Sequence, residues 1–146
     1  IKRLGEMNNL AMIESTKIGN TQGNEEHVII LDTIGELAKL YSLGTVVFIG
    51  GSLVNTGGHN LYEPVIYGKP VIFGPYIQDF KQSADLLVEK EIGFLVNNED
   101  ELKNKIIFLL QDPNHRRLIK EKADELLEDE GGAMKKTMDI IYSLLR

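Results

Sequence analysis

A loop rich in glycine and polar side chains holds the residues of this chain best suited to binding an anion. Its two Gly-Gly pairs begin at Gly50 and Gly57. The loop follows the apolar residues 46–49 and leads into residues 61–67, which are expected to form a short helix. Free N–H groups at a helix start, reached over glycines, suit a phosphate. The pattern predicts a nucleotide or sugar-phosphate site.

The glycine spacing differs from that of the two common nucleotide loops. A dinucleotide fingerprint requires G-x-G-x-x-G, and a Walker A loop requires Gly-Lys followed by Ser or Thr. Here the two Gly-Gly pairs stand seven residues apart and no Gly-Lys-Ser/Thr occurs. A tight turn without a ligand is the alternative interpretation of this loop.

Several side chains of the loop could contact a ligand. Glu63, three residues after Asn60, could accept hydrogen bonds from two ribose hydroxyls, or it could be an exposed glutamate in a first helical turn. His59 could contact phosphate, act as a general acid, or cap and pack. Ser52 could donate to phosphate or only end the strand. The possible phosphate contacts are therefore Ser52, Gly57, Gly58 and His59.

A second polar segment, residues 32–36, follows another apolar run. Asp32 or Thr33 can cap a helix, and Glu36 stands at the capping-box spacing from Thr33. Backbone groups of this segment could bind a base or a phosphate. Helix capping alone also explains Thr33 and Glu36.

Composition excludes several classes of function. The net charge of −6 makes the chain a poor nucleic-acid binder through phosphate neutralisation. Cysteine is absent, and the three histidines stand far apart without a metal-ligand spacing, so no metal site is expected. No apolar run approaches the roughly 20 residues of a membrane span. The absence of cysteine fits a cytoplasmic protein. The acidic run is expected to be a solvated helix face: Glu125, Glu128, Asp129, Glu130.

Apolar runs alternate with helical patterns along most of the chain. This alternation predicts an α/β fold, a Rossmann-like parallel sheet with helices on both faces, formed as one domain over residues 1–146. Ligands bind such sheets beyond the carboxyl ends of the strands. The expected strands are residues 10–13, 28–31 (buried), 45–49, 71–73 and 94–96. The expected helices begin after Thr33 and cover residues 61–67, 79–91 and 99–110, the last capped by Asn98. A further helix is expected to start at Pro113, break at Gly131-Gly132 and resume over 133–145.

Several motifs together are similar to those of a known enzyme family. The chain resembles the Kdo transferases over residues 28–146; these enzymes move 3-deoxy-D-manno-octulosonic acid (Kdo) from CMP-Kdo onto lipid A precursors in lipopolysaccharide synthesis. The pairing of Gly-Gly-Ser-Leu-Val with Gly-Gly-His-Asn is the specific part of the match. The motifs that carry the resemblance are residues 32–37, 40–41, 48–53, 57–60, 63–64, 68–71, 74–75, Phe80 and 132–133.

The resemblance implies one half of a GT-B glycosyltransferase. This chain, which begins with Ile1 and is expected to be a fragment, is similar to the C-terminal, donor-binding domain. The catalytic base, the acceptor surface for lipid A precursors and the membrane contact belong in the family to an N-terminal domain absent from this chain. The resemblance places the full-length enzyme on the cytoplasmic face of the bacterial inner membrane, and we expect the fragment to be soluble and inactive alone.

The resemblance also assigns the nucleotide contacts. CMP-Kdo is the donor, without a metal or another cofactor, and no catalytic residue falls in this chain. Leu61 and Tyr62 differ from the commoner family residues, so only their backbone is expected to matter. The implied CMP contacts are Ile34, Gly35, Glu36, Asn60, Leu61, Tyr62 and Glu63, with Glu63 on the ribose.

Two other functions fit the same residues. One is the donor domain of a GT-B enzyme that uses a UDP-sugar. The other is a Rossmann-like nucleotide-binding module with no catalytic role. A preference for CMP over UMP would exclude the first, and a loss of donor binding on replacing Glu63 would argue against the second.

Overall fold

The structure is a computed structural model that describes residues 12–14, 28–56 and 58–144. The chain divides into two compact units, Ile1–Lys39 and Leu40–Arg146. One domain was expected from the sequence. Among the described residues, no strand pairing joins the sheet of the first unit to that of the second.

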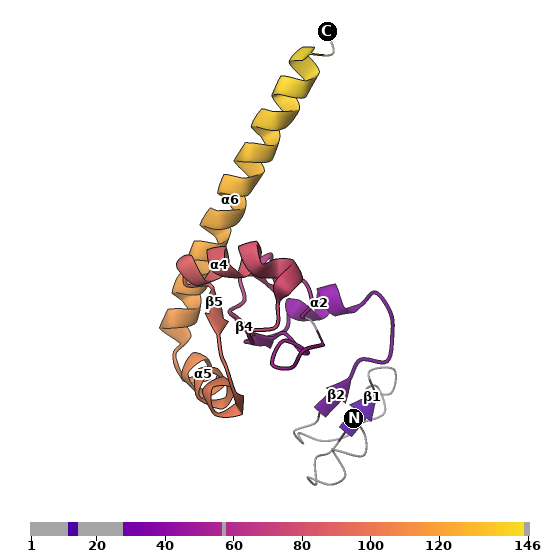
Figure 1. The fold of residues 1–146 in the computed structure, drawn as a ribbon, viewed down its shortest axis with the longest axis vertical. Helices are drawn as coiled ribbons and strands as arrows, with labels where there is room; N and C mark the ends of the chain where they lie inside the picture. The colour runs from indigo at the N-terminus through magenta and orange to yellow at the C-terminus, as the bar shows by residue number, and fades with distance from the viewer. Residues whose placement is uncertain (1–11, 15–27, 57, 145–146) are drawn as a thin grey trace. The chain divides into compact units, whose positions relative to one another are not determined.

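The described residues of the first unit form two short parallel strands. β1 (Met12–Glu14) pairs with β2 (Val28–Ile30), and Met12 lies opposite Val28 (Figure 1). β2 forms where the apolar run predicted it, but the expected burial is wrong. Val28 is 39% exposed and Ile29 is 55% exposed. A pair of short strands offers too little surface to enclose β-branched side chains.

The helix expected after Thr33 begins later and is shorter. α2 covers Leu37–Tyr41. Gly35 has a φ of 86°, a left-handed conformation that a helix cannot contain. The Thr33 hydroxyl donates to the Glu36 carboxylate, so these side chains bond each other and no capping box forms.

A three-stranded parallel sheet organises the second unit. The strands β3 (Val47–Phe48), β4 (Val71–Phe73) and β5 (Gly93–Leu95) stand in the order β3-β4-β5. Every residue of the central strand β4 is buried, which is why this segment is a continuous apolar run. The α/β fold with a parallel sheet, expected from the alternation of strands and helices, is confirmed.

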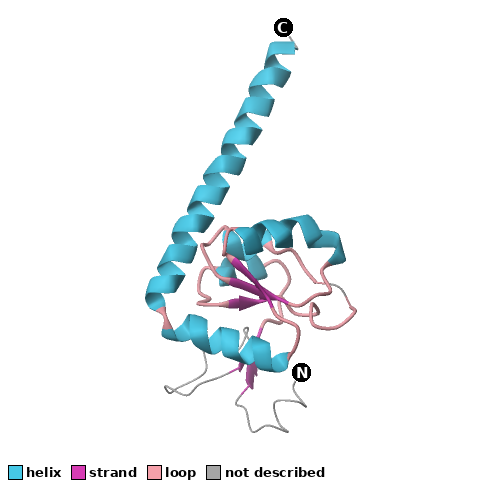
Figure 2. Ribbon diagram, turned by 60° about the vertical axis from the view of Figure 1, so that its left-hand side comes forward, coloured by secondary structure: helices cyan, strands magenta, loops and turns pink. Residues whose placement is uncertain are grey.

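Helices connect and follow these strands. α3 (Tyr62–Val65) joins β3 to β4, and a 3-10 turn, η2 (Gln78–Phe80), leads into α4 (Lys81–Glu89). α5 (Glu99–Gln111) begins where Asn98 predicted it, because the Asn98 side chain accepts a 2.9 Å hydrogen bond from the Glu101 N–H. α4 lies on one side of the sheet and α5 on the other (Figure 2).

The last helix is longer than expected. α6 covers Pro113–Leu144 and continues through Gly131 and Gly132, so the expected break there is wrong. Glycine costs a helix about 1 kcal/mol relative to alanine, which is a preference and not a stop. The residues on both sides of the pair are good helix formers, and they outweigh it.

One apolar core holds the second unit together. The helices α4, α5 and α6 each contribute to it, and so does Leu61 just before α3. The fully buried side chains at its centre are Leu61, Val65, Val71, Ile72, Phe73, Leu87, Ile92, Val96, Leu109 and Ile119.

Candidate functional site

Ser52 fastens the glycine loop after β3 to the loop after β4. Its side chain is fully buried, donates a 2.5 Å hydrogen bond to the Ile49 carbonyl and accepts one of 2.8 Å from the Gly74 N–H. The Ser52 carbonyl accepts from the Tyr76 N–H at 2.9 Å. The hydroxyl is thus used within the protein, and a phosphate could reach it only if the two loops separated.

Replacing Ser52 with alanine is expected to lower the free energy of unfolding by about 1–3 kcal/mol, because the buried Gly74 N–H loses its acceptor. Thermal or urea denaturation measures this difference. Thr56→Ala is the matched control, since the Thr56 hydroxyl lies on the same loop but is exposed and donates to the Gly51 carbonyl at 3.2 Å. The control should change the free energy by under about 1 kcal/mol. Equal losses in the two variants would contradict the proposed fastening.

Asn60 and Glu63 lie together at the start of α3. The Asn60 side-chain oxygen accepts from the Tyr62 N–H at 2.9 Å, and its amide group donates to Glu63 Oε1 at 3.4 Å. Glu63 is half-buried and Asn60 is exposed. A carboxylate has several acceptor positions, and the Asn60 amide uses one of them. A ligand hydroxyl can therefore bond this carboxylate, whose direction Asn60 supports.

The other residues of the glycine loop have different surroundings. Gly57 lies outside the described residues. Gly58 is half-buried, and a Cβ added there would stand 3.0 Å from the Ile77 side chain and 3.5 Å from Ser52 Cβ. A side chain at this position would fit only if Ile77 shifted by a few tenths of an ångström. His59 is exposed.

α3 is too short to attract an anion strongly. It has four residues, where residues 61–67 were expected to be helical. The helix dipole sums over aligned peptide groups, so a single turn contributes little of it. Any attraction for phosphate must come mainly from individual N–H groups and side chains of the loop.

The second predicted segment belongs to the first unit. Ile34, Gly35 and Glu36 are all exposed, and Ile34 is fully so. A Cβ added at Gly35 would meet no atom within 4 Å. This segment thus offers open backbone, whereas the Asn60–Glu63 segment of the second unit offers a supported carboxylate.

Two tyrosines near Glu63 have raised pKa values. Tyr41 was not predicted as a contact, and Tyr62 was predicted to act only through its backbone. Burial, and next the negative charge of Glu63, raise the pKa of Tyr41. The Tyr62 hydroxyl donates to Glu130 at 3.1 Å; burial and this bond raise the pKa of Tyr62 to about 12. Both phenols therefore stay protonated near neutral pH. Glu130 remains exposed as predicted, but it has a specific partner that the acidic run did not indicate.

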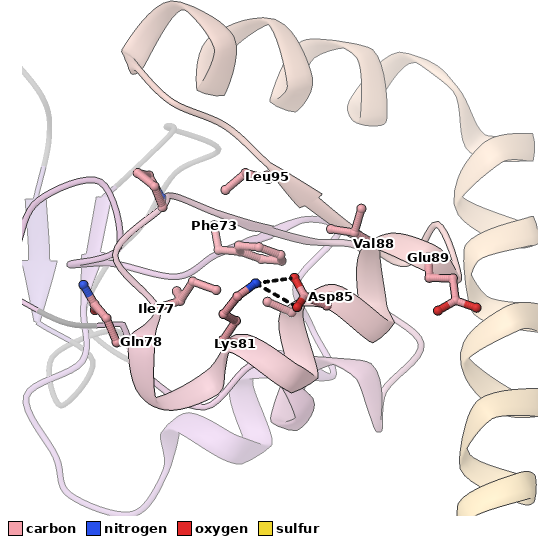
Figure 3. Close-up of a pocket in the computed structure, with 10 residues that line it drawn as sticks. Phe73, Ile77, Gln78, Lys81, Asp85, Val88, Glu89 and Leu95 are labelled. Carbon is pink, nitrogen blue, oxygen red and sulfur yellow. Dashed lines mark hydrogen bonds and ion pairs between the residues drawn. The ribbon is translucent and has the colours of Figure 1, made fainter.

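An apolar pocket of about 490 Å³ opens at the ends of β4 and β5 beside α4 (Figure 3). Its wall includes Phe73, Ile77 and Leu95, and the Lys81–Asp85 ion pair, 2.9 Å long, stands at its edge. Such a lining does not suit a phosphate. No predicted nucleotide contact lines the pocket. Among its lining residues, the exposed apolar side chains Val88 and Leu95 are the one signal that points to it.

In the described part of the chain, no group of three or more His, Cys, Asp or Glu residues could hold a metal ion. No helix in that part is both long enough and apolar enough to cross a membrane.

Sequence comparison places the chain among sugar-transferring enzymes. The sequence model of the family "Glycosyl transferases group 1" matches residues 17–126. The chain is 42% identical over 107 residues to a bifunctional glycosyltransferase/methyltransferase of Fusobacterium nucleatum, covering 73% of this chain and 17% of that protein.

Two further relatives are 3-deoxy-D-manno-octulosonic acid transferases. The enzyme of Aquifex aeolicus is 40% identical over 102 residues, and that of Haemophilus influenzae is 34% identical over 128 residues. These matches cover 70% and 86% of this chain but only 29% and 30% of the relatives. The resemblance to Kdo transferases is confirmed, and this chain spans under a third of their length.

A solved structure has the same fold. The crystal structure of the C-terminal CMP-Kdo binding domain of WaaA from Acinetobacter baumannii superposes with a TM-score of 0.77, at 24% sequence identity. The match covers 86% of this chain and 65% of that one. The fold is thus that of one half of a GT-B enzyme. Since the family model matches most of its residues, the chain belongs to the group 1 glycosyl transferases.

Proposed function

We propose that this chain is the donor-binding half of an enzyme that transfers Kdo from CMP-Kdo to a lipid A precursor. The relatives named as 3-deoxy-D-manno-octulosonic acid transferases support this proposal. The fold shared with a CMP-Kdo binding domain is consistent with it. In this role the chain holds the nucleotide and takes up the charge that develops on CMP as the sugar leaves.

The observation that carries the proposal is the paired Asn60 and Glu63. Asn60 bonds both the Tyr62 N–H and the Glu63 carboxylate, so Glu63 is oriented before any ligand arrives. We assign Glu63 to the ribose hydroxyls. Leu61 is fully buried, so it can contact CMP only through its backbone, and we propose the same for Tyr62.

The phosphate contacts are revised by the geometry of the loop. His59 is exposed and remains a proposed phosphate contact, together with the N–H of Gly58 and that of Gly57. Ser52 is not proposed to contact the phosphate; its side chain holds the loop in place through the Gly74 N–H. In the first unit, Ile34, Gly35 and Glu36 remain proposed contacts of CMP, and the backbone at Gly35 is open.

The rest of the reaction is assigned outside this chain. We propose that another domain supplies the base that deprotonates the acceptor hydroxyl, the lipid surface and the contact with the cytoplasmic face of the inner membrane. No metal or other cofactor enters the proposed step. No catalytic residue is assigned in this chain.

Titration with nucleotides tests the proposal. Calorimetry or amide NMR of this chain should detect weak binding of CMP, with perturbations centred on Asn60 and Glu63, and a lower affinity for UMP. A preference for UMP would indicate a UDP-sugar donor instead. Absence of binding to either nucleotide would contradict the donor-binding role.

A further inference from the structure

α6 contacts the segment of residues 62–68, which contains α3, at two points. Near the start of α3, the Tyr62 hydroxyl donates to Glu130 Oε1 at 3.1 Å. Beyond its end, Gly68 lies so close to α6 that an added Cβ would stand 2.5 Å from Lys120 Cγ. Tyr62 meets Glu130, and Gly68 meets Lys120. Residues 62–68 and α6 therefore run in opposite directions. Ten residues separate the two contacts on α6, about 15 Å of helix.

Glu130 is exposed and lies one turn beyond the buried stripe of α6. Ile119, Ala123 and Leu126 are buried in the core, at spacings of four and three residues. Glu130 follows Leu126 by four residues, so it lies on the same face of the helix. The stripe changes there from apolar to acidic, at the place where the Tyr62 hydroxyl meets it. The core contacts of α6 therefore determine where the Glu130 carboxylate stands.

Tyr62 joins this contact to the proposed nucleotide site. Its N–H is bonded to Asn60 and its hydroxyl to Glu130. In the sequence it lies between Asn60 and Glu63, whose mutual bond orients the carboxylate. The backbone of residues 60–63 is thus held from one side by Asn60 and from the other by α6.

We propose that Glu130 is a positioning residue of the nucleotide site, which holds residues 60–63 through Tyr62 so that Glu63 is presented to the ligand. This inference rests on the proposed function in one respect, that residues 60–63 contact the nucleotide. The hydrogen bond itself and its effect on the segment are independent of any ligand.

Two measurements test the positioning role. The first is hydrogen exchange of the Tyr62 N–H in the ligand-free chain, in which Tyr62→Phe and Glu130→Ala should each speed exchange about fivefold. The second is the CMP dissociation constant, which should rise about fivefold in the same variants. Glu130→Gln keeps an oxygen acceptor and should restore most of both.

A double-mutant cycle separates positioning from general stabilisation. If the bond acts as proposed, Tyr62→Phe combined with Glu130→Ala weakens CMP binding no more than either change alone. Two controls each remove a group without breaking the bond: Tyr67→Phe, at the other end of the same segment, and Glu128→Ala, two residues before Glu130 on α6. Neither control should speed exchange or weaken CMP binding.

Each outcome decides the inference. Unchanged exchange of the Tyr62 N–H in both variants would overturn it, as would additive losses in the cycle. Faster exchange with an unchanged CMP dissociation constant would also overturn it, since the bond would then order the segment without serving the site. If the unmodified chain binds no CMP, the proposed function fails, and the exchange measurement alone decides whether α6 holds the segment.

Discussion

Replacing Gly74 with alanine is expected to destabilise the chain more than any other single change considered. An added Cβ would stand 2.3 Å from the Ser52 carbonyl oxygen and 2.7 Å from Leu53 Cα. These are backbone atoms, which cannot rotate away as a side chain can. The two loops must then separate, which also breaks the bonds that Ser52 makes with Gly74 and Tyr76.

The cost of Gly74→Ala should be about 3 kcal/mol, at the upper end for overpacking. That corresponds to a fall in melting temperature of roughly 6–12 °C for a chain of this size. Gly50→Ala is the matched control, because Gly50 lies in the neighbouring loop and an added Cβ meets no atom within 4 Å there. Thermal denaturation followed by circular dichroism compares the two. If both variants melt together, the close approach of the two loops does not contribute to stability.

Replacing Glu63 with alanine is expected to reduce CMP affinity more than any other substitution in the described part of the chain. A hydrogen bond to a charged group contributes about 1.5–3 kcal/mol, which corresponds to a loss of about tenfold to a hundredfold. Glu63→Gln should have an intermediate affinity, since it keeps the shape of the side chain and one acceptor oxygen. Calorimetric titration of the three proteins measures the series.

The sign of the Glu63→Ala effect is informative, because the ligand and the protein are both negative. The chain carries a net charge of −6, so removing a carboxylate lowers its general repulsion of a nucleotide. Glu128→Ala makes the same change of charge at an exposed position of α6 and should leave affinity unchanged or slightly higher. Affinity retained in Glu63→Ala would remove the ribose contact from the proposal and favour a module that binds nucleotides differently.

The order of strands and helices follows from patterns within a few residues. The apolar run at residues 71–73 predicted a buried parallel strand, and β4 is one. Asn98 predicted the start of α5 because its side chain caps a backbone N–H three residues away. Such interactions depend only on nearby residues, so they can be read from the sequence.

Local patterns failed where a preference was weak or where burial depended on neighbours. Gly131 and Gly132 predicted a helix break, but the propensity of glycine is small and α6 continues. The apolar run of β2 predicted burial, yet Val28 and Ile29 are exposed because the strand pairs within a small sheet. The capping spacing of Thr33 and Glu36 predicted a helix start that the left-handed Gly35 prevents.

The sequence by itself determined the family, the parallel α/β architecture and the residues proposed to contact the nucleotide. Only the tertiary structure decided how those residues are supported. Ser52 meets the Gly74 N–H across 22 positions of sequence, and Tyr62 meets Glu130 across 68. Packing of the core brings the two loops together, and it also brings Glu130 of α6 to Tyr62 of α3. No pattern of neighbouring residues encodes such contacts, since they arise from packing between elements far apart in the chain.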